Sequence, residues 1–261
     1  MSRFLPHSTT GLLRAWPASA LALWTGAWQA GLVSPDDVLH TLSDYADVHE
    51  LDDPAAEHSR SALDLMNLVR TAPLTAVVLP APGDAQGLPP GVMNDDVQAA
   101  GEVLLLTRPH GCPVALTARG TPERCRWTAR TLDVALDVEA VGSEHGVGEV
   151  EYELRDAVTE AAAVIAGLAG PRSAGPADLR DALAARTQAA ALDLPPHDRQ
   201  RVDRMLATAG QIDAIVDLAG GGLGASASQL ESADAQLRQL SALTRRARAI
   251  AINALLRDYR R

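Results

Sequence analysis

The sequence contains no lysine, so all 23 of its lysine-plus-arginine residues are arginine. Arginine stays protonated in proteins and does not act as an amine nucleophile. The absence of lysine excludes a phosphate-binding-loop lysine, the strand lysine of protein kinases, and a Schiff-base or pyridoxal-phosphate lysine. It also excludes the Ser-x-x-Lys pair of penicillin-binding enzymes. Several large classes of enzyme are therefore closed to this chain.

Aromatic residues and cysteines are scarce. Aromatics make up 3% of the 261 residues, whereas hydrophobic residues as a whole make up 47%. The core must therefore be built mainly from small and aliphatic side chains, which favours closely packed helices. Cys112 and Cys125 are the only cysteines, too few for a disulfide framework. We expect free thiols and a cytoplasmic protein.

Long apolar runs and an excess of positive charge are also missing. Leu12–Trp28 is apolar but is interrupted by Pro17, Ser19 and Thr25, and it is shorter than the ~20 residues that span a membrane. The net charge of −10 opposes attraction to nucleic acid and to anionic lipid. We expect no membrane partner, and nucleic acid is a disfavoured partner.

Motifs for cofactors, metals and hydrolysis are absent or incomplete. Gly220–Ala225 reads GGGLGA, which matches the glycines of dinucleotide sites, but a predicted helix precedes it where that motif needs a strand. His110, Cys112 and Cys125 supply three soft ligands, whereas structural zinc takes four. Neither G-x-S-x-G nor H-E-x-x-H occurs. We expect no cofactor and no metal, and we assign no catalytic residue.

The apolar pattern predicts helices at both ends of the chain and strands between them. Helix signals fall at 17–31, 34–45 and Pro54–Arg70, and four further helices follow the glycine-rich segment 142–148. Runs rich in Val, Leu and Thr predict strands at 74–79, 103–107, 114–118 and 126–131. The sequence thus predicts an α+β protein in which N-terminal helices and a small, mainly antiparallel sheet are joined to a C-terminal helical bundle. The two predicted domains are residues 1–148 and 149–261.

The last predicted helix, residues 228–258, has two different faces. Its apolar stripe passes through Ala247, and most of its arginines lie on roughly the opposite face. These arginines are interpreted either as a solvated face or as a surface that grips phosphates. The candidate interaction surface consists of Arg238, Arg245 and Arg246.

The stretch Leu79–Asp96, LPAPGDAQGLPPGVMNDD, is rich in proline and glycine and separates two predicted strands. A connection of this length is more often functional or mobile than idle, although its prolines stiffen the backbone. The candidate ligand-binding residues are Asp84, Asn94, Asp95 and Asp96, with Asn94 equally explained as a helix N-cap. Both interpretations stay open: a binding loop and a rigid structural loop.

The order of these features resembles an uncharacterised family of actinobacterial proteins. The resemblance rests on the Ala- and Trp-rich first helix with Ser34-Pro35-Asp36-Asp37, the LPAPGDAQGLP loop, VLLLT and the C-terminal helical part rich in Ala, Arg and Leu. The resemblance implies a cytoplasmic protein, and it implies that the LPAPGDAQGLP loop is a feature of the family. It implies no activity, cofactor or catalytic residue.

The sequence leaves three hypotheses for the function. The leading hypothesis is a non-catalytic binding or protein-interaction protein with a regulatory or adaptor role, either monomeric or homodimeric. The alternative is an enzyme that acts on a small polar ligand at the Pro80–Asp96 loop. The third is a nucleic-acid binder that uses its arginine-rich helix. The direction in which the acidic groups of the loop point would separate the first two.

Overall fold

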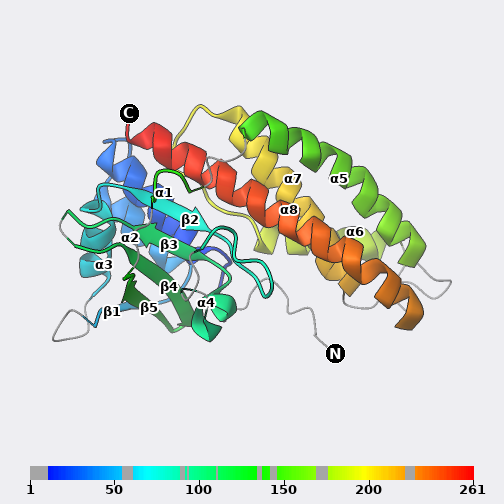
Figure 1. Cartoon of the computed structure of the whole chain (residues 1–261), viewed down its shortest axis with the longest axis horizontal. Coiled ribbons are helices and arrows are strands. Elements are labelled where there is room, and N and C mark those ends of the chain that lie inside the picture. The colour runs from blue at the N-terminus through cyan, green and yellow to red at the C-terminus, as the bar shows by residue number, and fades with distance from the viewer. Residues whose placement is uncertain are drawn as a thin grey trace.

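The computed structural model describes residues 11–54, 61–88, 92, 94–109, 111–133, 137–141, 146–168, 176–220 and 227–261. Within the helices over 161–168, 176–179 and 227–233, and at residue 220, the description covers the backbone alone. The first half contains both helices and strands, and the second half contains helices (Figure 1). This is the α+β class that the sequence predicted.

The first half contains four helices and all five strands of the described residues. The helices are α1 (Pro17–Gln29), α2 (Pro35–Ser43), α3 (Ala62–Arg70) and α4 (Asp95–Ala100). The strands are β1 (Val48–Asp52), β2 (Thr75–Val78), β3 (Val103–Leu106), β4 (Val114–Thr121) and β5 (Arg124–Thr131). They form one sheet in the order β1-β5-β4-β3-β2, in which β1 pairs with β5 in parallel and all other neighbours are antiparallel.

Two expectations about this half need correction. The strand β1 was not predicted, because Val48–Asp52 reads VHELD and carries three charged or polar residues in five. The helix expected from Pro54 begins at Ala62, where Ser61 and Asp64 form a capping box, and Pro54 lies in a turn. Residues 55–60 lie outside the described part of the chain.

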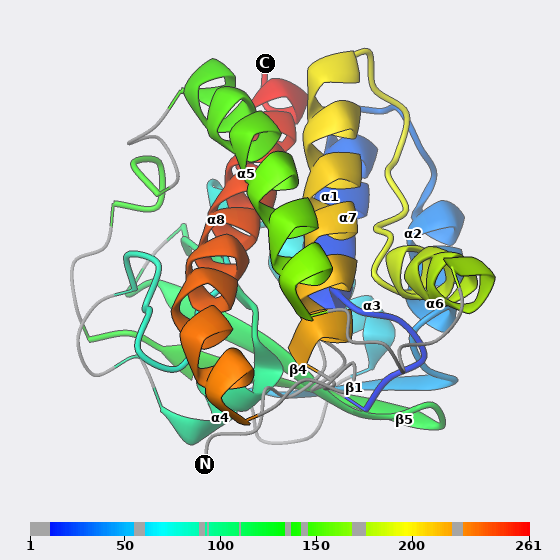
Figure 2. The same cartoon turned by 90° about the vertical axis from the view of Figure 1, so that its right-hand side faces the viewer.

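The second half contains α5 (Val147–Leu168), α6 (Pro176–Ala189), α7 (Gln200–Gly220) and α8 (Ala227–Tyr259). Helices α5, α7 and α8 lie side by side and contact one another (Figure 2). Apolar residues recur every three or four positions along α7 and all of them are buried, namely Val202, Met205, Ala209, Ile212, Val216 and Ala219. In α8 the predicted stripe is buried at Ala247 and Ala251. These helices bury one another as a bundle.

The two faces of the sheet are covered by different parts of the chain. One face packs on α1 and on α8, with Val77, Leu104 and Leu116 in a large core that also contains Ile212 and Ile252. The opposite face packs on the segment after β2 and on α4, in a smaller core. Its members include Val78, Leu88, Val92, Val97, Val103, Leu105 and Leu132. Because Leu88 and Val92 belong to this second core, these described residues of the Leu79–Asp96 stretch cover part of one face of the sheet.

Helix α8 also closes the edge of the sheet at β2. The side-chain Oδ1 of Asn253 accepts a hydrogen bond from Val77 N at 2.7 Å, and its Nδ2 donates to Val77 O at 2.9 Å. An edge strand otherwise presents unpaired N–H and C=O groups. One amide side chain therefore replaces a neighbouring strand at this position.

Candidate functional site

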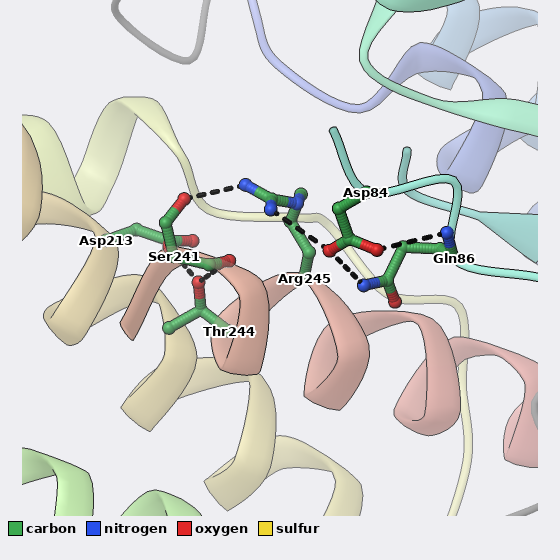
Figure 3. A network of polar contacts seen from close by, with 6 residues as sticks. All are labelled: Asp84, Gln86, Asp213, Ser241, Thr244 and Arg245. Carbon is green, nitrogen blue, oxygen red and sulfur yellow. Dashed lines mark hydrogen bonds and ion pairs between the residues drawn. The ribbon is translucent and has the colours of Figure 1, made fainter. Parts of the chain in front are cut away.

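Asp84 lies in a tight turn that begins and ends with the bridge between Ala81 and Asp84. Its carboxylate accepts hydrogen bonds from the Gln86 side chain at 2.6 Å, from Gln86 N at 3.2 Å and from Arg245 of α8 at 3.3 Å (Figure 3). Positive φ angles at Gly83, Gln86 and Gly87 shape this turn, and glycine adopts such angles without strain. The turn is therefore built around Asp84, and Asp84 binds the turn to the bundle.

The other acidic and amide candidates of the loop lie elsewhere. Asn94 is the N-cap of α4, because its side-chain oxygen accepts from Val97 N at 3.0 Å. Asp95 and Asp96 occupy the first turn of that helix, where carboxylates are favoured by the helix dipole. Asp96 pairs with the exposed Arg119 of β4 at 3.3 Å. Asp84 therefore contacts α8, whereas Asp96 contacts the sheet. Pro89–Gly91 and Met93 lie outside the described residues.

The three arginines of the candidate interaction surface differ in their surroundings. Arg238 pairs with Asp234 one turn earlier on the same helix and is exposed. Arg245 donates to Asp84 and to Ser241 Oγ and has a side chain only 15% exposed. Arg246 pairs with Glu153 of α5. Two of these arginines therefore fasten parts of the protein to each other, and their role as an interaction surface stays a prediction.

A buried ion pair lies two positions beyond Arg246 and was not predicted from the sequence. Arg248 donates to Asp213 of α7 at 2.8 Å, and the two side chains are 1% and 3% exposed. The guanidinium carbon of Arg248 lies 4.5 Å from the centre of the Trp16 ring, a cation–π distance. Thr244 donates to the same aspartate and to Ser241 O (Figure 3). The sequence held a signal, because Arg246 and Arg248 are two positions apart and cannot share one helix face.

Glu102 caps the N-terminus of α1 from the turn before β3. One carboxylate oxygen accepts from Ala18 N at 2.6 Å, and the other accepts from Ser19 N and Ser19 Oγ at 3.1 and 2.8 Å. Burial raises the pKa of this carboxyl to about 7, although these hydrogen bonds and the nearby Arg248 oppose the rise. The helix needs this remote cap because its own N-cap residue, Trp16, provides no side-chain cap.

Three further groups with shifted pKa values, Tyr45, His49 and Cys125, are also buried. Burial raises the pKa of the Cys125 thiol to about 12 and also raises the pKa of Tyr45. The nearby carboxylate of Glu102 raises both pKa values further. Burial lowers the pKa of His49, whose Nδ1 accepts from Trp127 Nε1 at 2.9 Å and whose Nε2 lies 2.8 Å from Leu42 O. A thiol with a raised pKa is a poor nucleophile. These groups serve the core.

No metal centre is found within the described residues, where no three His, Cys, Asp or Glu side chains are grouped to hold an ion. Cys112 is exposed and Cys125 is buried, and both are free. His110 and residues 221–226 of the GGGLGA pattern lie outside the described part of the chain. Among the helices that the structure describes, none combines the length and hydropathy needed to cross a bilayer.

Three arginines gather on the outer surface of the bundle, where α5 and α7 begin. Glu151 of α5 lies 3.0 Å from Arg201, 3.5 Å from Arg204 and 3.9 Å from Arg155. The glutamate side chain is 17% exposed, and the arginine side chains are between 58% and 72% exposed. Tyr152, the next residue along α5, is 64% exposed. Sequence reasoning missed this group, because its members come from two helices.

The chain is similar to two family models, the N-terminal domain of Rv1486c-like protein over residues 18–141 and its C-terminal domain over residues 148–249. A protein of Mycobacterium tuberculosis, named Uncharacterized protein Rv1486c, is 31% identical and covers 92% of this chain and 97% of its own length. The chain belongs to the Rv1486c-like family. A Mycobacterium leprae relative, Uncharacterized protein ML1804, is 29% identical over the same shares.

Membership of this mycobacterial family confirms the resemblance to an actinobacterial family. The names of these relatives state no activity, ligand or partner. No solved structure is significantly similar to the chain. That the LPAPGD loop marks the Rv1486c-like family stays a prediction, as does the division into domains at residue 148.

Proposed function

We propose that this member of the Rv1486c-like family is a cytoplasmic, non-catalytic binding protein that acts by protein interaction, as a monomer or a homodimer. The observation that carries the proposal is the separation of the loop carboxylates. Asp84 is held by Gln86 and Arg245, and Asp96 pairs with Arg119. An enzyme that works on a small polar ligand needs titratable groups that converge on one exposed site.

The positions of three groups with raised pKa values support the same proposal. Glu102 and Tyr45 are fully buried in the described structure, and Cys125 is buried with a raised pKa. Glu102 is occupied by the N-terminus of α1. A general acid or base must instead come within hydrogen-bond reach of a substrate. These groups therefore have no access to one, and stability is the role that their contacts support.

The test compares a loop variant with the wild type in two assays. Asp84→Asn combined with Asp95→Asn and Asp96→Asn removes three candidate carboxylates while it keeps their size. For a binding protein, affinity capture of the tagged chain from an actinobacterial host, followed by reciprocal capture, recovers the same partner with wild type and variant. A wild type that captures no partner would contradict the proposal, whereas a partner lost only with the loop variant would place the binding site at the loop.

The enzyme alternative makes the opposite prediction in a thermal-shift screen of small polar compounds. A ligand present at 100 times its Kd stabilises the folded state by about 2.7 kcal/mol, which is easily seen as a higher Tm. The enzyme alternative expects such a compound, with the shift abolished in the triple variant. The proposed function expects no compound whose effect depends on these three residues.

A further inference from the structure

We propose that the interaction surface lies where α5 and α7 begin, and that it binds an acidic segment of a protein partner. This inference rests on the proposed function and adds the surface and the chemistry of the partner. We call this surface the basic patch and define it by Tyr152, Arg155, Arg201 and Arg204 around Glu151.

The basic patch has many more hydrogen-bond donors than its single acceptor can use. Each guanidinium carries five N–H groups in a planar fork, and the three forks share one carboxylate, that of Glu151. Among the described residues no second carboxylate pairs with these three arginines. Most of their N–H groups therefore face water and can bind oxygen atoms of another molecule. Glu151 holds the forks near one another, which lowers the entropy lost on binding.

Stability is a poor explanation for this arrangement. A surface ion pair contributes only ~0–1 kcal/mol, and three guanidiniums drawn together by one carboxylate also repel one another. Tyr152 is exposed beside them, in a chain with only three tyrosines. Tyr and Arg are the residue types that are enriched at protein interfaces and among their strongest contacts.

The ends of the two helices add to the attraction for anions. Helices α5 and α7 run in the same direction and begin at the same end of the bundle (Figure 2). The positive ends of both helix dipoles therefore lie near the basic patch. Arg201 belongs to the first turn of α7, and Gly148 in the first turn of α5 lies close to its guanidinium.

The surroundings favour a short acidic peptide over a nucleic acid. Glu149 and Asp156 of α5 are exposed nearby, and Asp203 of α7 pairs with His197 at 3.3 Å. These carboxylates and the net charge of −10 repel a long polyanion, whose binding depends on many phosphate contacts. A short acidic peptide can place two or three carboxylates directly on the guanidinium groups of the basic patch, and it extends too little beyond them to experience most of that repulsion.

The experiment measures fluorescence anisotropy of a labelled peptide of alternating Glu and Ala residues at low salt. Arg201→Gln with Arg204→Gln is expected to weaken binding about tenfold or more, because two charge-assisted contacts are lost. Glu151→Gln is expected to tighten binding about two- to fivefold, because it removes the negative charge that competes for the arginines, while the amide oxygen of Gln still accepts hydrogen bonds and keeps the forks near one another. Arg126→Gln with Arg130→Gln, which changes two exposed arginines of β5, is the matched control and leaves affinity unchanged.

Gain of affinity in Glu151→Gln separates binding from folding, because a damaged fold would not bind more tightly. The proposal is overturned if the peptide does not bind, if the control weakens binding as much as Arg201→Gln with Arg204→Gln, or if a DNA strand of equal charge binds more tightly. Affinity capture distinguishes the two levels of inference. A partner that stays bound to the Arg201→Gln and Arg204→Gln variant refutes this surface alone, whereas a wild type that captures no partner refutes the proposed function.

Discussion

At Arg248 a charge occupies a position where the helical pattern of α8 places an apolar residue. Ala247 and Ala251 beside it are fully buried, and so is the guanidinium, which meets Asp213 and the Trp16 ring. Taking two charges out of water costs several kcal/mol, which their attraction offsets only when the pair is complete. A single polar residue therefore fixes how α8 lies against α7 and the start of α1.

Replacing Arg248 by Met should lower the free energy of unfolding by about 3–5 kcal/mol, because Asp213 would stay buried without its partner. Adding Asp213→Leu should recover a large part of that loss, because no uncompensated charge then remains and Thr244 keeps its bond to Ser241 O. Urea midpoints of both variants give the comparison. If the single variant is as stable as the wild type, the pair is not the contact that holds these helices.

Burial raises the pKa of Glu102 from 4.5 to about 7. Between these values the folded state binds more protons than the unfolded state, so stability falls as pH rises through this window. The loss is on the order of 3 kcal/mol from pH 4.5 to 7. The difference in unfolding free energy between wild type and Glu102→Gln should fall by this amount. A difference that does not change with pH would contradict the assignment.

The protonation of His49 acts in the opposite direction and does not enter that difference. Burial lowers its pKa from 6.5, so the folded state binds fewer protons and stability rises with pH up to about 6.5. Because His49 is present in both proteins, its contribution cancels when the two are subtracted. The comparison therefore isolates Glu102.

At the scale of the elements, the sequence predicted those whose signals are local. The start of α2 at Ser34 and the N-cap of α4 at Asn94 depend on partners within a few residues, and the apolar residues of α7 recur every three or four positions. The missed features depend on residues far apart in sequence. Strand β1 exists because β5 pairs with it, and the cap of α1 comes from Glu102, about 84 residues away from Ala18.

The residues of the candidate site also fall into those with local sequence signals and those that depend on contacts between distant parts of the chain. Asn94 could be assigned from its sequence context, whereas the clasp between Asp84 and Arg245 joins residues that are 161 positions apart. The basic patch likewise takes Glu151 from one helix and Arg201 from another. Helical periodicity gives the face on which a residue lies, but it does not tell which element that face will meet.

Asn253 offers a test of how α8 holds the sheet. Asn253→Leu should cost about 2–4 kcal/mol of unfolding free energy, because it leaves the N–H and C=O groups of Val77 buried without partners. Asn67→Leu changes an exposed residue of α3 and should cost under ~0.5 kcal/mol. Chemical denaturation of both variants gives the two values. Equal small effects would mean that water can satisfy Val77 and that α8 does not seal this edge.

At the scale of the whole molecule, the hydrophobic core contains residues from both sides of the predicted domain boundary at residue 148. The two family models also divide the chain there, at residues 141 and 148. However, one cluster of buried residues contains Leu21 and Val77 from the first half together with Ile212 and Ile252 from the second. Two polar contacts also join the two halves of the chain. Glu102 lies near Arg248, and Asn253 accepts a hydrogen bond from Val77 N. The boundary in sequence is therefore not a boundary in packing.

The full chain should unfold in a single cooperative transition, because α8 is part of the sheet's core as well as of the bundle. Separate expression of residues 1–146 and 147–261 would expose the apolar faces of β2 and α1 on one fragment and of α8 on the other. Neither fragment should show a cooperative urea transition by circular dichroism. Their mixture should restore it if both are soluble, because the surfaces are complementary. A fragment 147–261 that unfolds cooperatively on its own, with a midpoint near that of the full chain, would establish the bundle as an independent domain docked on the sheet.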